Sequence, residues 1–566
     1  MNGPTMATAI LAMDGFPDRD YSFVNLKGET HGLSFPELGL LCRRLGAGLL
    51  EMGILPKQRI AIVSREPFDS VRSLFAAFAA GIVPVLVYPP NILGDNTAYF
   101  DHLHAQLTSV GVGRVLMDET SLALLGPKRM ESHWKDRVLA LNLVQEADPV
   151  ALLQSAPIHP QDPALLQFTS GSGSLSKAVV VSHQNLFANS HAILIDGLAI
   201  QPGDRAVCWL PLYHDMGLIG HVVAPAIQGL SVSLYPTSAF LKRPGMWMDA
   251  VSKHKGTITF APNFAFGLAA RAKSAPHLDL SSLRVLGCGA EPIQPETLKN
   301  FLTVFCPLGL NPSAIFPCYG LAEHTLAAAF PKVGEGLCVL AVNARAYREE
   351  GLARPSTAGE PEDSLDFVSC GRAFPGHTLT IQTSGAEQIL PEGSIGEIVL
   401  QGPSVASEYL NRHEETRATF SDGSLRTGDL GFLFQGCLFV TGRRKDLIIM
   451  NGRNFDPQHI EYIAEQIPQV REGSAFAFSI PGPITERLVL LYETRNYPTD
   501  ELDKRIKAQV VGSLGVTPYI VAAQKAHSLP KTTSGKKRRG RAREIFLEAM
   551  ARQDKSSLTV EPGMEA

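Results

Sequence analysis

A glycine- and hydroxyl-rich stretch of the chain could bind the phosphates of a nucleotide. It follows the apolar run 164–166 and precedes the β-branched run 179–181. Its candidate ligands are Thr169, Ser170, Gly171, Ser172, Gly173, Ser174 and Lys177. Glycine lets successive backbone N–H groups curl around an anion, and the hydroxyl groups and lysine add donors. The spacing differs from a Walker A loop, so an ordinary flexible turn is the alternative interpretation.

A His-Asp pair, His214 and Asp215, lies between apolar flanks after a predicted strand. One interpretation is a helix start with Asp215 as an acidic first-turn residue. A metal site is less favoured, because no second histidine or cysteine lies at ligand spacing. A third interpretation places His214 beside the carboxylate of a substrate.

Two further glycine turns have a similar character, and the first of them follows a predicted strand. Gly289, Ala290 and Glu291 come after the run 284–286, and the second turn consists of Cys318, Tyr319, Gly320, Leu321, Ala322 and Glu323. Open parallel sheets bind their ligands beyond the carboxyl ends of the strands, so both turns are candidate ligand sites.

A basic run near the end of the chain has three possible interpretations. Six of the residues 536–543 are lysine or arginine, and Lys536 follows directly after Thr-Thr-Ser-Gly. The run could contact nucleic acid, form a solvated basic edge, or present Lys536 at an exposed loop tip. Spacing alone does not separate these interpretations.

The composition is that of a multidomain globular protein. The chain has 566 residues, more than one hydrophobic core usually serves, and its net charge of −4 implies no general attraction to nucleic acid. The eight cysteines include no Cys-x-x-Cys pair, which is typical of reduced thiols in the cytoplasm. The longest apolar run, around residues 74–88, contains Gly81 and Pro84 and is too short to span a bilayer. We therefore expect a cytoplasmic protein without stable membrane insertion.

Strand and helix patterns alternate through the first half of the chain. A hairpin is predicted over residues 20–30, and Ser34 with Glu37 predicts a capping box at the start of the next helix. Strand-like runs then recur, at 59–63, 82–88, 115–117, 137–141, 231–235, 257–260 and 284–286. This order predicts parallel β-α-β units and an α/β fold.

The pattern changes in the second half. Residues 331–366 have many glycines and prolines and predict an inserted, partly irregular segment, which a β-rich region follows. A smaller region with its own strands and helices begins after residue 442. We predict two domains, 1–443 and 444–566.

Five segments, in order, resemble motifs of the adenylate-forming superfamily of acyl-CoA synthetases, luciferases and amino-acid adenylation domains. They are residues 168–177, 319–323, 426–429, 442–446 and 530–536. Residues 209–220, 261–265, 289–292 and 317–323, with the insertion at 331–366, most resemble the fatty acyl-AMP ligases. The resemblance covers nearly the whole chain. It implies a large N-terminal α/β domain with a β-rich part and a small mobile α+β C-terminal domain.

The resemblance also implies a reaction, in which a fatty acid attacks the α-phosphate of ATP and pyrophosphate leaves. Because two anions must approach each other, cations and oriented N–H groups have to stabilise the transition state. Residues 169–177 would hold the leaving phosphates, Glu323 would bind Mg²⁺, and Lys536 would bridge carboxylate and α-phosphate. His214 would lie near the acyl carboxylate. Among the implied nucleotide-binding residues, Tyr319 would stack on adenine and Asp429 would accept hydrogen bonds from the ribose. The full set is Gly289, Ala290, Glu291, Cys318, Tyr319, Gly320, Leu321, Ala322, Asp429 and Arg443.

The resemblance further implies two orientations of the small domain, with Lys445 as the hinge. In the second orientation the thiol of an acyl carrier protein attacks the acyl-adenylate. Only about thirty residues follow Lys536, too few for an independent fold, so we expect the carrier to act in trans. The alternatives are an acyl-CoA synthetase and a non-catalytic nucleotide- or acyl-adenylate-binding protein. The latter is motivated by Gly173, Ser176 and Ala178, where the family usually has Thr, Pro and Gly.

Overall fold

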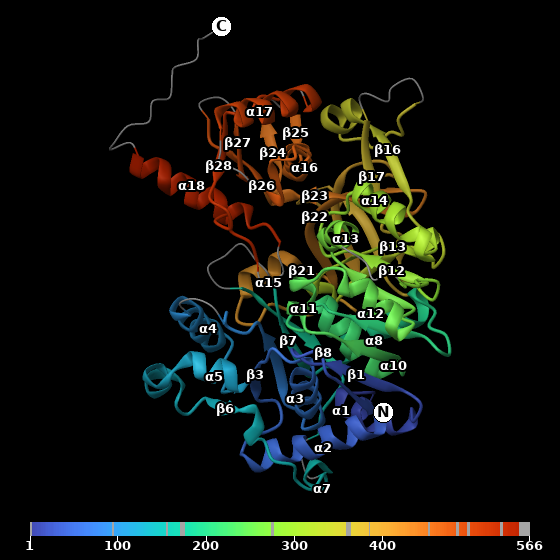
Figure 1. Ribbon diagram of the computed structural model, residues 1–566, viewed down its shortest axis with the longest axis vertical. Coiled ribbons are helices and arrows are strands. Elements are labelled where there is room, and N and C mark those ends of the chain that lie inside the picture. Colours follow the sequence, from blue (N-terminus) through green and yellow to red (C-terminus); the bar gives the residue numbers. More distant parts are fainter. Residues whose placement is uncertain are drawn as a thin grey trace. The chain divides into compact units, whose positions relative to one another are not determined.

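The computed structural model divides into two compact units, which are described separately (Figure 1). The first consists of Met1–Val342, Pro355–Thr427 and Gly431–Val440, and the second of Asn343–Arg354, Gly428–Leu430 and Thr441–Ala566. The structure describes residues 3–92, 96–153, 157–169, 176–272, 277–357, 364–383, 385–450, 453–482, 486–494, 499–514, 516–532 and 536–553. No helix among these residues is long and apolar enough to cross a membrane.

A seven-stranded sheet in the first unit carries two of the predicted glycine turns. Its strand order is β13-β12-β11-β9-β10-β1-β2, and only the β1–β2 pair is antiparallel. The strands are β1 Asp20–Val24, β2 Thr30–Ser34, β9 Arg205–Cys208, β10 Ser231–Leu234, β11 Ile258–Ala261, β12 Val285–Cys288 and β13 Ile315–Pro317. The hairpin predicted over residues 20–30 is thus confirmed as β1 and β2.

A second, four-stranded sheet of the first unit is parallel throughout, in the order β4-β3-β5-β6. It consists of β3 Arg59–Val63, β4 Val83–Val87, β5 Arg114–Met117 and β6 Val138–Ala140. The helices α2 Phe35–Glu51 and α3 Pro67–Ala79 pack against each other (Figure 1). The predicted capping box starts α2, because Ser34 accepts from the backbone of Glu37 and the Glu37 carboxylate accepts from that of Ser34.

The remaining helices of the first unit are mostly short. They are α1 Met6–Ala12, α4 Thr97–Ser109, α5 Glu119–Leu125, α6 Pro127–Arg129, α7 Val150–Leu153, α8 His183–His191, α9 Asp215–Leu218, α10 Ala224–Gln228, α11 Thr237–Lys242, α12 Met246–His254, α13 Asn263–Arg271, α14 Pro295–Phe305 and α15 His413–Thr419. The helix α9 begins at Asp215, which confirms the helix-start interpretation of the His-Asp pair.

Antiparallel strands complete the first unit. The hairpin of β7 Pro163–Phe168 and β8 Ala178–Ser182 flanks the predicted phosphate loop. The β-rich region contains β14 Tyr319–Gly320, β15 Ala327–Phe330, β18 Arg372–Ala373, β19 Thr378–Gln382, β20 Gly396–Gln401, β21 Phe420–Ser421, β22 Ser424–Phe434 and β23 Cys437–Arg443. Residues 428–430 of β22 and 441–443 of β23 belong to the second unit. The predicted insertion is less irregular than expected, because β16 Val339–Asn343 pairs with β17 Ser364–Val368.

The second unit is built on a three-stranded sheet in the order β26-β27-β28. Its elements are β24 Ile448–Met450, β25 Arg453–Phe455, β26 Val470–Ile480, β27 Arg487–Thr494, β28 Ile520–Gln524, and the helices α16 Pro457–Glu465, α17 Asp500–Leu514 and α18 Arg539–Gln553. Ile460, Leu490 and Ile506 are fully buried in its core, which is separate from the core of the first unit.

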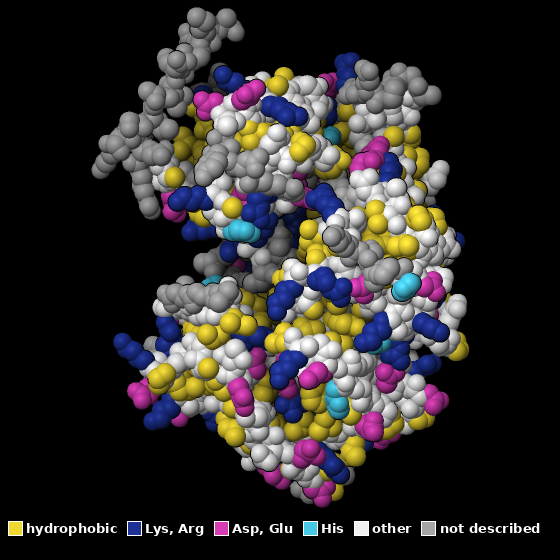
Figure 2. Space-filling view, in the orientation of Figure 1, with side chains coloured by type: hydrophobic (Ala, Val, Ile, Leu, Met, Phe, Trp, Pro, Cys, Tyr) yellow, Lys and Arg dark blue, Asp and Glu magenta, His cyan; other side chains and the backbone are white. Residues whose placement is uncertain are grey.

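Two charges of the basic run near the end of the chain are paired within the second unit. Lys537 lies 2.9 Å from both Glu461 and Glu465, and Arg539 forms ion pairs with Glu461 at 2.7 Å and Asp446 at 3.2 Å. These pairs hold the beginning of α18 and the residues just before it against α16. On the face of the molecule in Figure 2, basic and acidic side chains are interspersed.

Candidate active site

The predicted phosphate loop begins and ends at a closed hairpin. The backbone N–H of Thr169 donates to the carbonyl of Lys177 at 2.9 Å, which extends the pairing of β7 with β8 by one step. The Lys177 Nζ lies 4.4 Å from the centre of the Tyr409 ring, within range of a cation–π contact. Five predicted phosphate ligands lie outside the described residues, namely Ser170, Gly171, Ser172, Gly173 and Ser174.

The predicted magnesium ligand, Glu323, is fixed by two contacts. Its carboxylate Oε1 accepts a 2.5 Å hydrogen bond from the Tyr409 hydroxyl, and its backbone carbonyl accepts from the N–H of Ala406 at 2.9 Å. Mg²⁺ in phosphate-transferring sites binds one or two carboxylates together with substrate phosphates. A single oriented carboxylate fits that requirement. The described residues contain no group of three side chains that could hold a metal ion by themselves.

A strained turn follows Glu323 directly. Thr325 has φ +65° and ψ −61°, and the N–H of Leu326 donates to the carbonyl of His324 at 2.7 Å. This is a γ-turn with positive φ, an uncommon conformation for a β-branched residue. The Thr325 hydroxyl donates to the carbonyl of Ser404 at 2.7 Å, which helps to hold the strained turn in place. The γ-turn at Thr325 and the hydrogen bond that holds it together restrict the backbone next to Glu323.

Residues 404–410, which we call the clamp segment, join the phosphate hairpin to the Glu323 turn. At one end Ser404 and Ala406 bind that turn, as described above. Toward the other end, the carbonyl of Glu408 accepts from the N–H of Val180 at 3.0 Å, and the N–H of Leu410 donates to the carbonyl of Ala178 at 2.9 Å. The clamp segment thus places Tyr409 where it contacts both Lys177 and Glu323.

His214 is oriented by its neighbour. Its Nδ1 lies 2.6 Å from Oδ1 of Asp215, which is 9% exposed. A carboxylate only accepts hydrogen bonds, so Nδ1 carries a hydrogen and Nε2 is the nitrogen that can contact a ligand.

Sequence reasoning missed a further residue, Gln167, whose buried amide donates to the carbonyls of Phe168 and Tyr213 at 3.3 and 3.1 Å. Gln167 therefore ties the base of the phosphate hairpin to the segment before His214.

The two glycine turns meet at the carboxyl ends of β12 and β13; the first of these strand ends was predicted. The N–H of Cys318 donates to the carbonyl of Cys288 at 2.8 Å, and a Cβ on Gly289 would lie 2.7 Å from the Cys318 Sγ. Ala290 has φ +65°, and the Glu291 carboxylate accepts from the N–H of Phe264 at 2.6 Å. These contacts hold the two turns against each other and tie the first turn to the start of α13.

The second turn is tightly packed as well. A Cβ on Gly320 would lie 2.0 Å from the carbonyl oxygen of Leu326, so only glycine fits there. Tyr319 is 8% exposed, and Leu321 and Ala322 lead into the turn that holds Glu323. The stacking of Tyr319 on adenine stays a prediction.

Asp429, the predicted ribose ligand, and Arg443, its predicted partner, both belong to the second unit and lie on neighbouring strands. Asp429 on β22 is 5% exposed, and its Oδ1 lies 2.9 Å from Nε of Arg443 at the end of β23. The arginine therefore orients a buried carboxylate that can accept hydrogen bonds from two hydroxyl groups. Lys445 is exposed in the single turn Arg444–Asp446 that connects β23 with β24, and its role as a hinge stays a prediction.

Lys536 lies in a loop of the second unit that is closed by backbone contacts. Its N–H donates to the hydroxyl of Thr532 at 2.9 Å, and the N–H of Thr532 donates to its carbonyl at 2.7 Å. Residues 533–535 between them lie outside the described residues. Lys536 is half-buried, and its place at an exposed loop tip stays a prediction.

A buried carboxyl group with an unusual pKa lies beside the predicted hinge. Asp456 caps α16 by accepting from the N–H of Gln458 at 3.0 Å, and a Cβ on Gly442 would lie 3.3 Å from its Oδ1. Burial raises the pKa of Asp456 from 3.8 to about 7; the helix-cap hydrogen bond and Arg539 oppose this rise, and Glu461 and Asp446 add to it.

This shift predicts a pH-dependent stability. Between about pH 4 and pH 7 the folded chain keeps the Asp456 proton that the unfolded chain releases, so this residue makes the free energy of unfolding fall as pH rises. Asparagine keeps the helix cap without the charge. We expect the melting temperature of Asp456→Asn to exceed that of the wild type by more at about pH 8 than at about pH 5. A constant difference across this range in thermal unfolding scans would contradict the prediction.

The contact between Tyr409 and Glu323 predicts a second measurable effect. Tyr409→Phe keeps the ring against Lys177 but removes the hydroxyl that orients Glu323. A hydrogen bond to a charged group typically contributes about 1.5–3 kcal/mol. We therefore expect Tyr409→Phe to lower kcat/KM for Mg·ATP by about ten-fold. Tyr409→Leu also removes the cation–π contact and should lower it further. The two variants are compared by ATP–pyrophosphate exchange, and an unchanged kcat/KM in Tyr409→Phe would refute a positioning role.

Comparison with known proteins connects this geometry to a family. A family profile described as "AMP-binding enzyme" matches residues 12–410. The chain is 35% identical to a putative acyl-CoA synthetase of Caulobacter vibrioides, over 96% of this chain and 95% of the relative. It is 33% identical to the medium-chain-fatty-acid–[acyl-carrier-protein] ligase JamA of Moorena producens, over 93% and 92% of the two chains. A solved structure from studies of fatty acyl-adenylate ligases of E. coli and L. pneumophila superposes with a TM-score of 0.90 at 33% identity, covering 97% of this chain and 99% of that one.

Proposed function

Because the chain belongs to the family of AMP-binding enzymes, we propose that it is a fatty acyl-AMP ligase that loads an acyl carrier protein. The fatty-acid carboxylate attacks the α-phosphorus of ATP, a carboxyl–phosphate bond forms, and pyrophosphate leaves with the electrons of the broken P–O bond. The thiol of the carrier's phosphopantetheine then attacks the acyl carbon, losing its proton, and AMP leaves. Relatives with these substrates in their names, aligned over nearly the whole chain, support the proposal.

The observation that carries the adenylation step is the arrangement around Tyr409. It brings a cation, Lys177, and an oriented carboxylate, Glu323, to one aromatic side chain. In our proposal Lys177 stabilises the leaving phosphates, and Glu323 holds the Mg²⁺ that arrives with ATP and offsets the charge of the phosphate oxygens. The loop 169–177 lies between the hairpin strands and would supply backbone N–H groups to the same phosphates.

The other predicted site residues have the following roles in our proposal. Gly289, Ala290 and Glu291, together with residues 318–322, form the backbone surface that we propose for the adenine ring. His214 presents Nε2 to the acyl carboxylate. Asp429 and Arg443 of the second unit bind the ribose, and Lys536 bridges carboxylate and α-phosphate. The domain division at 443–444 and the hinge role of Lys445 belong to the same proposal.

ATP–pyrophosphate exchange tests the adenylation step directly. The purified full-length chain is mixed with Mg·ATP, labelled pyrophosphate and a panel of fatty acids of different chain lengths. We expect exchange that depends on the fatty acid. Nucleotide binding without exchange for any acid would favour the non-catalytic alternative and overturn the proposal.

Coenzyme A is an alternative acceptor of the acyl group in the second step, acyl transfer. The name of one relative favours it, because the Caulobacter vibrioides protein is called a putative acyl-CoA synthetase. In a single reaction, a phosphopantetheinylated acyl carrier protein and coenzyme A compete for the acyl-adenylate. Mass spectrometry then measures acyl-carrier and acyl-CoA together. We expect mainly the carrier product. Efficient formation of acyl-CoA would instead identify an acyl-CoA synthetase.

A further inference from the structure

A buried histidine of the first unit has a hydrogen-bonding atom that none of the described residues satisfies. His221 is 2% exposed in the π-helical turn η5 Ile219–Val223. Its Nδ1 lies 3.0 Å from the carbonyl oxygen of Met216, whereas its Nε2 has no hydrogen-bond partner. Because a carbonyl only accepts, Nδ1 carries the ring hydrogen. Nε2 is therefore a bare acceptor.

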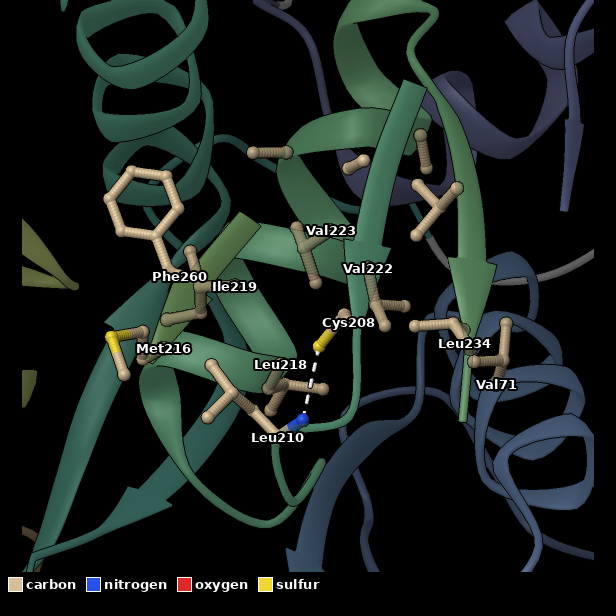
Figure 3. Packing of buried hydrophobic residues seen from close by; sticks show 14 of the residues in the cluster. Val71, Cys208, Leu210, Met216, Leu218, Ile219, Val222, Val223, Leu234 and Phe260 are labelled. Atoms are coloured by element: carbon tan, nitrogen blue, oxygen red, sulfur yellow. Dashed lines mark hydrogen bonds between the residues drawn. The ribbon is translucent and has the colours of Figure 1, made fainter. Parts of the chain in front are cut away.

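The surroundings keep this ring neutral. Burial lowers the pKa of His221 to about 4, so Nε2 retains its lone pair at neutral pH. Met216, Ile219 and Phe260 belong to the apolar cluster drawn in Figure 3. An unpaired acceptor among apolar groups is costly, and such an atom in a native protein calls for a water or ligand that satisfies it.

The segment around His221 packs close to three other parts of the first unit: the end of β11, the strand before the glycine turn 289–291, and the turn after Glu323. Its ring packs edge-to-face on Phe260 near the carboxyl end of β11, with the ring centres 5.8 Å apart. A Cβ on Gly287, two residues before the glycine turn 289–291, would overlap that same Phe260 ring. A Cβ on Gly220, next to His221, would lie 3.2 Å from Leu326 in the strained turn after Glu323.

His221 therefore packs near the carboxyl end of β11, the end of the strands at which an open parallel sheet binds its ligand. His214, proposed to face the acyl carboxylate, lies seven residues earlier in the same segment. The acyl chain has to extend away from that carboxylate into apolar surroundings, and those around His221 are apolar.

We propose that the acyl-binding region of this protein accepts a fatty acid that carries a hydroxyl group, which donates to Nε2 of His221. This inference rests on the proposed function. The donor must be neutral, because an ammonium group would lose its hydration among Met216, Ile219 and Phe260. A plain acyl chain has no donor and leaves Nε2 unpaired, so the site discriminates against it.

The test compares a saturated medium-chain fatty acid with its monohydroxy isomers, the hydroxyl stepped along the chain. ATP–pyrophosphate exchange gives kcat/KM for each acid with the full-length protein. We expect one isomer to exceed the plain acid by about ten-fold. In His221→Leu that ratio should fall to about one, and in His221→Gln, whose amide oxygen can accept, it should be partly restored. His254→Leu is the matched control, because the His254 Nε2 already has a partner, the Tyr235 hydroxyl at 2.9 Å.

The outcomes separate this inference from the function on which it rests. Exchange with plain and hydroxylated acids at equal kcat/KM means that Nε2 is satisfied by a resident water, and it overturns the inference alone. A hydroxyl preference that survives in His221→Leu also overturns it. The wild-type ratio is informative even if His221→Leu does not fold. Absence of exchange with every acid overturns the proposed function and this inference together.

Discussion

Lys536→Ala is expected to lower the rate of fatty-acid-dependent ATP–pyrophosphate exchange by about 10²–10³-fold, the typical effect of removing one preorganised donor. The carboxylate and the α-phosphate are both anions, and a cation between them stabilises the charge that develops as they join. The loop itself should survive the substitution, because alanine keeps the backbone N–H and carbonyl of residue 536 that Thr532 contacts. The melting temperature should therefore change little.

The neighbouring lysine provides a matched control for this prediction. Lys537 lies 2.9 Å from both Glu461 and Glu465. Its removal leaves buried carboxylate charge less compensated, so Lys537→Ala should lower the melting temperature of the full chain. The two variants are expected to separate stability from chemistry. A Lys536→Ala protein that retains most of its exchange activity would remove this lysine from the mechanism.

Much of the architecture of the first unit could be predicted from local sequence. β-branched runs bounded by glycine and proline predicted β3, β5, β10, β11 and β12 to within one or two residues. The capping box at Ser34 was equally local, because both of its members lie within one helical turn. Alternation of these strands with helical patterns then indicated parallel sheets. Such features depend on residues close together in the chain, and sequence reasoning is strongest there.

The contacts that orient the candidate active site were not predictable in this way. Tyr409 lies 86 residues from Glu323 along the chain, and no spacing rule connects the two. The role of Gln167 depends on the carbonyl of Tyr213, which only the fold brings near. The partners of Lys537 and Arg539 could not be predicted either, because Glu461 and Glu465 lie on the helix α16, more than seventy residues earlier in the chain. The sequence around Tyr409 gave little sign of its role, because it shows only an aromatic residue in a segment without a clear strand or helix pattern.

Glu323→Gln is expected to reduce kcat/KM for Mg·ATP by about 10²-fold, because a bound divalent cation typically supplies several kcal/mol of transition-state stabilisation. Glutamine has nearly the same shape and its amide oxygen can still accept from Tyr409, so the clamp segment should stay in place. The charge that attracts Mg²⁺ is lost. The measurement is exchange activity over a range of Mg²⁺ concentrations, and the variant should need more Mg²⁺ for half-maximal rate.

A double-mutant cycle separates a metal-binding role of Glu323 from a purely structural one. If Tyr409 acts by orienting the Glu323 carboxylate, its hydroxyl should matter little once the charge is gone. Tyr409→Phe would then cost about ten-fold in the wild type but much less in Glu323→Gln. Fully additive effects, or a Glu323→Gln variant with unchanged Mg²⁺ dependence, would mean that this carboxylate serves only to hold the clamp segment. The Mg²⁺ ligand would then have to be sought elsewhere in the site.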